Sequence, residues 1–351
     1  MSVKMKAYCY VAPFKIEEQE RDVPEPGKGQ VRIKVKAVSI CGSDTGGFKG
    51  TSAMRVAPLV MGHEFSGIVD KYGDDVQNPE VPVGGRVVVY PNIPCGKCPD
   101  CLAGLPNLCE ERFIPGTTMP AGGYDGAMAD YVVVPANKLI PISDKISFEE
   151  GSMFEPTSVA LRGVKMLSDV KDKTVTVFGA GPIGLLALEC LKYLGAKDVI
   201  SIDLNEERLK KALECGASYV INSKDVDPVE KVMEITGGKG ADAGADCVGI
   251  AVSLNTSMKM VKNGGEIAMI GMATEHMDGF EYKYAVAHEM KLKGSYCYVD
   301  ELYEIPKMIE EGKLDLKKLI TSTVPMSQVQ ERFEDLVSGH SKEVKVILKN
   351  D

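Results

Sequence analysis

The sequence predicts an α/β protein that combines a β-rich unit with a doubly wound parallel sheet. The first 150 residues contain short runs of β-forming residues between Gly- and Pro-rich turns, at 30–38, 64–72, 86–90 and 130–134. Frequent short strands of this kind are typical of an all-β or barrel-like unit. Farther along, apolar strands alternate with helical segments, at 174–179, 198–204, 218–222, 245–249 and 266–271. This alternation favours a parallel sheet whose faces are covered by helices.

Two helical segments of the second region differ in their apolar pattern. Residues 182–195 are apolar nearly all round, so we expect that helix to be buried. Residues 205–216 are amphipathic and end at Gly216, a favourable C-terminal cap. Both patterns agree with helices that pack on a parallel sheet.

The last stretch of the chain contains two helical segments and an apolar strand, at 301–312, 327–338 and 344–349. We expect the terminal strand to return to the β-rich unit. The predicted division therefore joins 1–155 to 296–351 in the β-rich unit and leaves 156–295 as the parallel-sheet unit.

The composition argues against several classes of function. The formal net charge of the 351 residues is -9, whereas a nucleic-acid-binding face needs a concentration of basic residues. No run of about eighteen apolar residues predicts a membrane span, and the N-terminal residues lack the apolar stretch of a signal peptide. We therefore expect a cytoplasmic protein without nucleic-acid or membrane partners, whose cysteines stay reduced.

A glycine-rich motif lies between a predicted strand and a predicted helix. Gly179, Gly181 and Gly184 form the pattern G-x-G-x-x-G. Pro182 and Ile183 separate the last two glycines. The glycines permit a tight turn, the approach of a pyrophosphate to the backbone, and close packing of helix on strand. The context predicts a Rossmann fold with the pyrophosphate at the helix N-terminus, although a flavin or another nucleotide on the same fold is an alternative.

An acidic residue follows the motif at the spacing expected for ribose recognition. Asp203 lies nineteen positions after Gly184, at the end of the next predicted strand. A carboxylate there binds the ribose hydroxyls and repels a 2′-phosphate, so the sequence favours NAD over NADP. Arg208, one helical turn later, is assigned to the adenine side of the site. Val248 and Ile270, in two later strands, are also assigned to the cofactor site.

A cluster of cysteines predicts a structural metal site. Cys95, Cys98, Cys101 and Cys109 follow the pattern C-x2-C-x2-C-x7-C in a loop with Gly and Pro. Four thiolates at this spacing can surround one tetrahedral Zn²⁺ and leave no position for a substrate. An iron–sulfur cluster is the alternative, but the seven-residue gap and the lack of a second cysteine cluster favour zinc.

A second set of possible metal ligands is spread over the first half of the chain. Cys41 follows the first of the predicted strands listed above, His63 and Glu64 begin the next, and Glu155 lies at the entry to the second unit. Cys, His and Glu are acceptable ligands for a catalytic zinc that keeps one open position. Such a zinc polarises an alkoxide, so that hydride can leave for a nicotinamide. Each of these residues taken singly is equally compatible with a structural role.

The order of these motifs along essentially the whole chain resembles that of the zinc-dependent medium-chain alcohol dehydrogenase family. The resemblance implies a GroES-like catalytic domain, a Rossmann NAD-binding domain and a homodimer or homotetramer. It also implies Cys41 and His63 as ligands of the catalytic zinc. Glu64 is implied as a ligand or as a close neighbour that exchanges with water.

Three further positions refine the resemblance. Glu155 stands where relatives that act on simple alcohols have a Cys, as in the sorbitol, galactitol-phosphate, butanediol and threonine dehydrogenase group, and it can bind the zinc or a zinc-bound water. Ser43, beside Cys41, is the expected first acceptor of the alcohol proton. Gly46 stands where many relatives have a His. This difference makes threonine a less favoured substrate. It also leaves Ser43, ribose hydroxyls, water or Glu155 as the route for the proton.

The sequence as a whole predicts oxidation of a secondary hydroxyl of a polyol or sugar alcohol, phosphorylated or not, with NAD and zinc. A vicinal diol of the butanediol type or threonine is the alternative substrate. A non-catalytic nucleotide-binding protein is the alternative class, but it need not retain a full set of zinc ligands. Lys49 and Arg55 are placed to meet an anionic substrate group, although solvated surface charges are the commoner arrangement.

Overall fold

The computed structural model describes residues 3–77, 79–118 and 124–350, and the chain divides into two compact units. The first unit comprises Met1–Glu155 and Ile320–Asp351, and the second comprises Pro156–Leu319. The first unit is therefore built from both ends of the chain. Its second boundary lies at Ile320 rather than at the expected 296.

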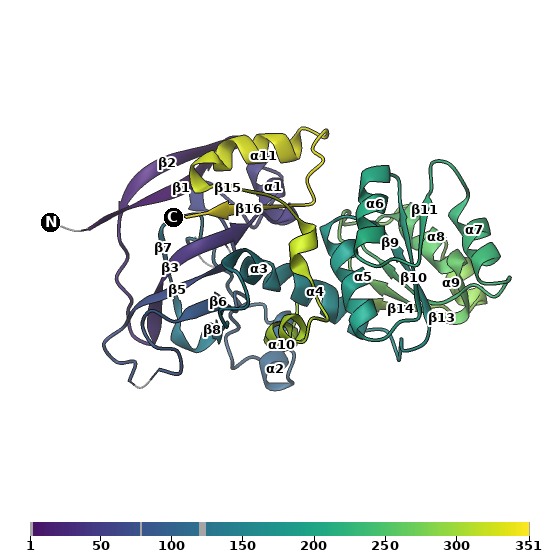
Figure 1. Ribbon diagram of the computed structural model, residues 1–351, viewed down its shortest axis with the longest axis horizontal. Coiled ribbons are helices and arrows are strands. Elements are labelled where there is room, and N and C mark those ends of the chain that lie inside the picture. Colours follow the sequence, from purple (N-terminus) through teal and green to yellow (C-terminus); the bar gives the residue numbers. More distant parts are fainter. Residues whose placement is uncertain (1–2, 78, 119–123, 351) are drawn as a thin grey trace. The chain divides into compact units, whose positions relative to one another are not determined.

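The first unit is β-rich, with two sheets that are seen in Figure 1. The smaller sheet has the strand order β2-β1-β4, and the larger has the order β15-β16-β3-β5-β6-β8, with β7 also paired to β3. The strands are β1 (Lys4–Ala12), β2 (Lys15–Asp22), β3 (Gln30–Ser39), β4 (Leu59–Val60), β5 (Glu64–Tyr72), β6 (Arg86–Val89), β7 (Tyr131–Pro135), β8 (Leu139–Pro141), β15 (Ile320–Pro325) and β16 (Lys345–Lys349). Alternate residues of β3 face a common core, with Val31, Ile33 and Val35 fully buried.

Short helices flank these sheets. They are α1 (Gly42–Phe48), α2 (Pro99–Leu102), α3 (Phe148–Ser152), α11 (Val329–Val337), η1 (Pro106–Leu108), η2 (Ala136–Lys138) and η5 (Met326–Gln328). Phe48 of α1 packs against Phe333 of α11 with ring centroids 5.2 Å apart, and both rings are fully buried. This contact attaches the C-terminal helix to the helix that follows Cys41.

The terminal strand returns to the first unit, as expected. β16 pairs antiparallel with β3, with Ile347 opposite Ser39 and Lys349 opposite Ala37, and pairs parallel with β15. The last residues of the chain therefore lie beside the strand that leads into Cys41.

The second unit contains a parallel sheet of strand order β11-β10-β9-β12-β13-β14, with helices on both of its sides (Figure 1). Its strands are β9 (Thr174–Phe178), β10 (Asp198–Asp203), β11 (Tyr219–Asn222), β12 (Ala241–Asp246), β13 (Val261–Met269) and β14 (Lys291–Gly294). Its helices are α4 (Phe154–Lys165), which begins at the unit boundary, α5 (Pro182–Tyr193), α6 (Glu206–Glu214), α7 (Pro228–Ile235), α8 (Ala251–Met260), α9 (Tyr282–Ala287), α10 (Ile305–Glu310), η3 (Glu301–Tyr303) and η4 (Leu316–Leu319). The doubly wound α/β arrangement predicted from the sequence is confirmed.

Most predicted elements of the second unit coincide with observed ones. Helix α5 is buried along most of its length, and α6 is followed by Gly216 in the left-handed conformation, with a φ of 94°. The prediction of a strand at 245–249 was wrong by several residues, because the observed strand, β12, comprises Ala241–Asp246. The strand ends at Asp246 because that carboxylate accepts hydrogen bonds from the backbone N–H groups of Val248 and Gly249. These bonds stabilise a turn of the chain.

The segment 296–319 joins the second unit because its side chains pair with helices of that unit. Glu301 of η3 lies 3.3 Å from Arg162 of α4, and Lys318 lies 4.0 Å from Glu189 of α5. The apolar side chains of this segment are also buried; they include Leu302, Ile305, Met308, Leu316 and Leu319. The sequence pattern predicted helical structure in this segment, but it did not indicate which of the two units the segment packs against.

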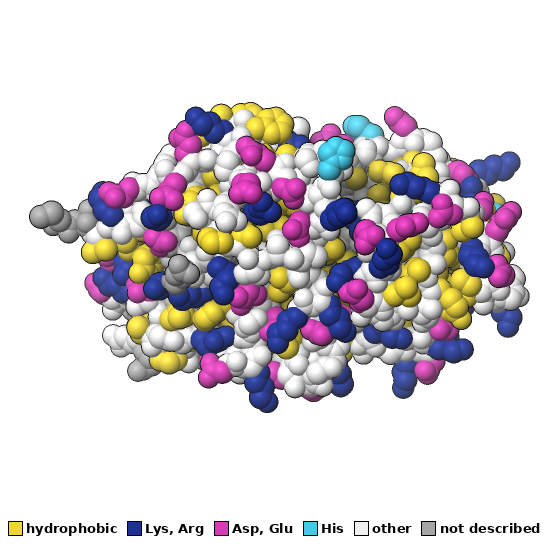
Figure 2. Space-filling model, turned by 45° about the horizontal axis from the view of Figure 1, so that its top comes forward, with side chains coloured by type: hydrophobic (Ala, Val, Ile, Leu, Met, Phe, Trp, Pro, Cys, Tyr) yellow, Lys and Arg dark blue, Asp and Glu magenta, His cyan; other side chains and the backbone are white. Residues whose placement is uncertain are grey.

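Acidic and basic side chains are interspersed over the face shown in Figure 2. Many of them are paired at the surface, such as Lys210 with Glu207 on α6 at 2.9 Å. None of the helices in the described part of the chain is both long enough and apolar enough to cross a bilayer.

Candidate functional site

Three possible metal ligands meet in the first unit, and we call Cys41, His63 and Glu64 the metal group. One ligand atom from each lies within 4.8 Å of the others. Cys41 is the N-cap of α1, just beyond the end of β3, and Glu64 is the first residue of β5. Because β3 and β5 pair antiparallel with Ser39 opposite Glu64, the end of one strand meets the start of the other. The sequence prediction that these three residues form one site agrees with this geometry.

The Glu64 side chain is buried, and its two oxygens have different surroundings. Oε2 accepts a 2.6 Å hydrogen bond from Lys345 Nζ and a short one from Ser39 Oγ. Oε1 is buried and has no hydrogen-bond partner among the described residues. A buried carboxylate oxygen without a donor is costly unless a cation or a water occupies it. Together with the Cys41 thiol and the His63 imidazole, the Glu64 carboxylate makes a donor set that fits Zn²⁺.

His63 is held by an acid that the sequence prediction did not include. His63 Nδ1 lies 3.5 Å from Oδ1 of Asp44, which is fully buried. Burial disfavours the charged ring, but Asp44 and Cys41 hold the pKa of His63 well above its usual value. The pocket thus stabilises a positive charge on or beside this imidazole, and a metal ion on the other ring nitrogen would supply it.

Arg55 is buried, so the expectation of a solvated surface charge was wrong, whereas a contact with an anionic substrate group stays a prediction. The residue is 5% exposed, and its Nε donates a 2.7 Å hydrogen bond to Asp44 Oδ1. Although burial disfavours the Asp44 charge, Arg55 and His63 hold the pKa of that carboxyl well below its usual range. Lys49, the other basic residue considered, is exposed at the end of α1.

Lys345 is, after Asp44, a second neighbour of the metal group that sequence reasoning missed. It lies on β16, its side chain is 4% exposed, and Nζ donates to Glu64 Oε2 and to the backbone oxygen of Ile40. Burial opposes its charge, but Glu64, Cys41 and Glu155 keep the pKa of Lys345 raised. The sequence signal that could have identified Lys345 is the presence of a lysine within the otherwise apolar run 344–348, which indicates a buried charge with a partner.

Ser43 and Glu155 hold different relations to the metal group. Ser43 Oγ donates to Cys41 Sγ at 3.1 Å, and its backbone N–H also faces that sulfur at 3.5 Å. Glu155 is half-buried at the sequence boundary between the units, and its negative charge helps to raise the pKa of Lys345. It is not one of the three residues whose ligand atoms meet in the metal group. A metal-binding role for Glu155 therefore stays a prediction.

The predicted cysteine lobe is assembled. The sulfurs of Cys95, Cys98, Cys101 and Cys109 lie within 4.8 Å of one another. Backbone N–H groups of Cys95 and Cys98 face the sulfurs of Cys109 and Cys95, each at 3.4 Å. Backbone donors lower the pKa of Cys95, whereas desolvation and the neighbouring thiols raise the pKa of Cys101 to about 12. Four thiolates in so small a volume repel one another, so the lobe fits a cation such as Zn²⁺.

The glycine motif of the second unit forms the turn between β9 and α5. A Cβ on Gly184 would lie 1.7 Å from the backbone oxygen of Gly179, so helix and strand can approach only with glycine there. A Cβ on Gly181 would meet no atom within 4 Å. Gly181 is the N-cap of α5 without a side-chain cap, and Pro182 follows as the first helical residue. The open space and the uncapped N–H groups, together with Ile183 in the first turn, fit a pyrophosphate.

The other predicted cofactor residues surround this turn. Asp203, at the end of β10, accepts the backbone N–H of Ala180 at 2.6 Å and that of Asn205 at 2.8 Å. Asp203 therefore also stabilises the glycine-rich turn. Its distance from Gly184 in the sequence predicted only the contact with the ribose. A Cβ on Gly179 would lie 2.7 Å from Val248 Cγ2, so Val248 borders the same turn. Arg208 is exposed on α6, and Ile270 is buried after β13.

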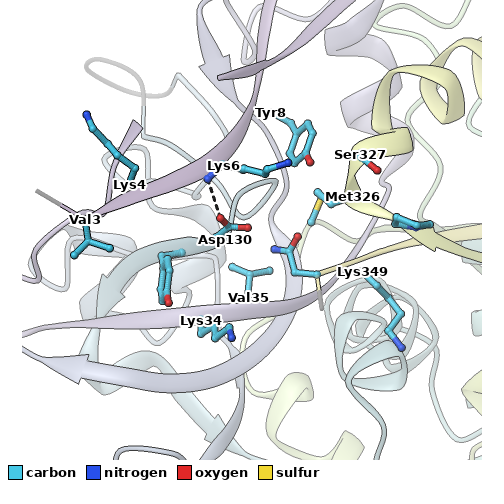
Figure 3. Close-up of a pocket in the computed structure, with 13 residues that line it drawn as sticks. Val3, Lys4, Lys6, Tyr8, Lys34, Val35, Asp130, Met326, Ser327 and Lys349 are labelled. Carbon is cyan, nitrogen blue, oxygen red and sulfur yellow. Dashed lines mark hydrogen bonds between the residues drawn. The ribbon is translucent and has the colours of Figure 1, made fainter. Parts of the chain in front are cut away.

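A separate concavity of the first unit contains none of the predicted site residues. Its volume is about 490 Å³, and lysines from β1, β3 and β16 line it, as Figure 3 shows. Asp130 in this pocket accepts the backbone N–H of Lys6 at 2.8 Å. The side chains of Lys4 and Lys6 pair with Asp22 and Glu18. The described residues of its wall include no cysteine or histidine.

Comparisons with known proteins show which family the chain resembles over most of its length. Residues 27–144 match the alcohol dehydrogenase GroES-like domain, and residues 182–312 match the zinc-binding dehydrogenase family. The chain is 32% identical to L-idonate 5-dehydrogenase of Vitis vinifera, over 90% of this chain and 87% of that protein. It is 30% identical to sorbitol dehydrogenase of Bacillus subtilis, over 98% of this chain and 97% of that protein. The crystal structure of 2R,3R-butanediol dehydrogenase from Bacillus subtilis matches with a TM-score of 0.89 and 30% identity, covering 99% of this chain and all of that one.

Proposed function

This chain belongs to the zinc-binding alcohol dehydrogenase family, and we propose that it oxidises a secondary hydroxyl of a polyol or sugar alcohol with NAD as hydride acceptor. The single observation that carries the proposal is the metal group of the first unit, in which a carboxylate oxygen of Glu64 lies near the ligand atoms of Cys41 and His63. Among the described residues, Glu64 Oε1 has no hydrogen-bond partner. The names of the relatives, which include sorbitol and L-idonate dehydrogenases, support a polyhydroxylated substrate.

Residues of both units would hold the two cofactors. Cys41 and His63 are the proposed ligands of the catalytic zinc, and Glu64 or Glu155 completes the set directly or through a water. When bound, zinc polarises the substrate hydroxyl and the nicotinamide accepts the hydride. The turn at Gly181 holds the pyrophosphate. Asp203, placed at the end of β10, favours NAD because its charge repels a 2′-phosphate.

The proton of the substrate hydroxyl needs a route that does not use a histidine, because Gly46 occupies the position where many relatives have one. Ser43 has one O–H and two lone pairs, and it lies against the Cys41 sulfur. Ser43 also accepts a 2.8 Å hydrogen bond from Arg55, which leaves one lone pair for the substrate hydroxyl. We propose Ser43 as the first proton acceptor: as its oxygen takes the substrate proton, its own proton turns away from Cys41 Sγ and passes to a ribose hydroxyl, water or Glu155.

One substrate alternative has its own support. The likeness to 2R,3R-butanediol dehydrogenase favours a vicinal diol as the second candidate. Threonine is less favoured because of Gly46. A protein that only binds nucleotides would not require the complete metal group, which argues for catalysis.

The proposal is tested by NADH formation with zinc-loaded protein and a panel of substrates. The panel contains sorbitol, L-idonate, galactitol, galactitol 1-phosphate, 2,3-butanediol and threonine, each with NAD and with NADP. Activity with a polyol and NAD supports the proposal. Activity with butanediol alone selects the alternative, and silence on the whole panel, with zinc and NAD bound, overturns the substrate class.

Two further properties are proposed with the function. Because the family relatives are dehydrogenases of small molecules, we infer a cytoplasmic enzyme that forms a homodimer or homotetramer. Sedimentation of the purified protein distinguishes these two assemblies from a monomer.

A further inference from the structure

Arg55 is a buried cation whose guanidinium contacts residues around the metal group. Its Nε donates to Asp44 Oδ1 at 2.7 Å, its Nη2 donates to Ser43 Oγ at 2.8 Å, and the same Nη2 lies 3.4 Å from His63 Nδ1. A Cβ on Gly47 would lie 2.6 Å from Arg55 Cδ, so glycine at that position of α1 makes room for the arginine stem. One planar group thus touches the neighbours of two metal ligands.

The chemistry of the guanidinium fixes the direction of the hydrogen bonds. Arginine only donates, so Ser43 Oγ must accept from Arg55. The single proton of the Ser43 hydroxyl is then directed to the Cys41 sulfur, 3.1 Å away. A metal-bound cysteine is a thiolate, and a hydrogen bond to its sulfur reduces the electron density that the sulfur gives to the metal.

We propose that Arg55 is a positioning residue of the reaction, which orients the Ser43 hydroxyl onto Cys41 and fixes Asp44 against His63. In this way it sets how strongly the sulfur ligand donates to the metal, and hence how strongly the metal polarises the substrate. This inference rests on the proposed function, because it assigns a metal to Cys41 and His63.

The test replaces zinc with Co²⁺ and measures the sulfur-to-cobalt charge-transfer band in the absence of substrate. The variants are Arg55→Lys, Ser43→Ala and the double variant. Lysine keeps the charge that compensates the buried Asp44, but one ammonium cannot reproduce the fork of a guanidinium. Because the cysteine lobe is unchanged in every protein, difference spectra isolate the contribution of Cys41.

We expect Arg55→Lys and Ser43→Ala each to shift the band to longer wavelength, because the thiolate loses its hydrogen bond. The double variant should show no further shift beyond Ser43→Ala, since both changes act on the same bond. Lys49→Met, which removes an exposed charge from the end of α1, is the matched control and should leave the band in place.

Two outcomes overturn the proposal. A wild-type spectrum in Arg55→Lys means that charge alone matters, and fully additive shifts mean that Arg55 does not act through Ser43. The measurement needs no substrate, so it can fail while the dehydrogenase activity stands. The reverse also holds, because a protein inactive on every polyol can still show the expected shifts.

Discussion

Lys345, on the last strand of the chain, donates a 2.6 Å hydrogen bond to Oε2 of Glu64, and both side chains are almost completely buried. The bond fixes one oxygen of the carboxylate, whereas Oε1 is buried and has no hydrogen-bond partner among the described residues. Charge compensation for the metal group therefore comes from a residue 281 positions away in the sequence.

Removal of this lysine should destabilise the protein strongly. Lys345→Met leaves the Glu64 carboxylate buried without its cation, which costs about 3–5 kcal/mol when one partner of a buried pair is lost. The free energy of unfolding in urea measures the effect. Lys349→Met on the same strand is the control, because its ion pair with Glu149 is half-exposed and should contribute about 1 kcal/mol or less. Equal losses in the two variants would contradict this account.

Loss of the Ser43 hydroxyl should slow turnover. If Ser43 receives the proton of the substrate, Ser43→Ala should lower kcat by about tenfold or more, as expected when a proton-transfer group is removed. Ser43→Thr keeps a hydroxyl and should recover most of the rate. Steady-state kinetics on the active polyol measure both, and an unchanged kcat in Ser43→Ala removes the proposed proton route.

The charge of Asp203 should determine the choice between NAD and NADP. In Asp203→Asn the amide oxygen can still accept the N–H of Ala180, but the repulsion of a 2′-phosphate is lost. We expect the ratio of kcat/KM for NADP to that for NAD to rise by about tenfold or more. Glu207→Gln, an exposed carboxylate in the first turn of α6, is the control. A comparable rise in the control would mean that general surface charge sets the preference.

The cysteine lobe should bind one zinc ion and stabilise the first unit. Cys101→Ser should lower the zinc content by one ion per chain, measured by atomic absorption, and should lower the thermal midpoint of unfolding. Leu102→Ala changes an exposed residue of the same loop and should alter neither. Iron with the absorbance of a cluster in the purified protein would favour the iron–sulfur alternative instead.

Glu189 of α5 should make stability depend on pH. Desolvation raises its pKa from 4.5 to about 7, only partly offset by Lys318. The native state holds this proton more tightly than the unfolded chain does, so stability falls as pH rises from about 4.5 to about 7. Glu189→Gln should remove this loss and gain roughly 2–3 kcal/mol at pH 8. Urea unfolding of both proteins at about pH 5 and pH 8 measures it; an equal pH dependence in the variant would contradict the prediction.

The features that could be predicted from the sequence are those whose residues lie close together along the chain. The glycine motif spans Gly179 to Gly184, and the cysteine lobe spans Cys95 to Cys109, so spacing alone defines each geometry. The pairing of the terminal strand with the first unit was also predictable. Its apolar side chains have to be buried, and an extended segment buries them by joining a sheet. β14 was not, because Lys291–Gly294 carries no apolar alternation.

The supporting residues of the metal group could not be predicted for a physical reason. Arg55 and Lys345 are basic residues, which are usually exposed, and only the fold shows that each is buried against an acid. Asp44 belongs to the motif that begins at Cys41, but its hydrogen bonds to Arg55 and Cys41 depend on the turn into α1. Side-chain pairs of this kind follow from tertiary structure and have no local sequence pattern.

The discontinuous first unit has a consequence for the order in which the protein folds. The whole of the second unit is encoded between the two parts of the first, so a ribosome completes it before β15 and β16 emerge. Until then the last residues of β3, Ala37 to Ser39, lack their partner strand β16, and Glu64 lacks the hydrogen bond from Lys345. We therefore expect the parallel sheet to fold during synthesis, and the metal pocket to close only when the final strand is added.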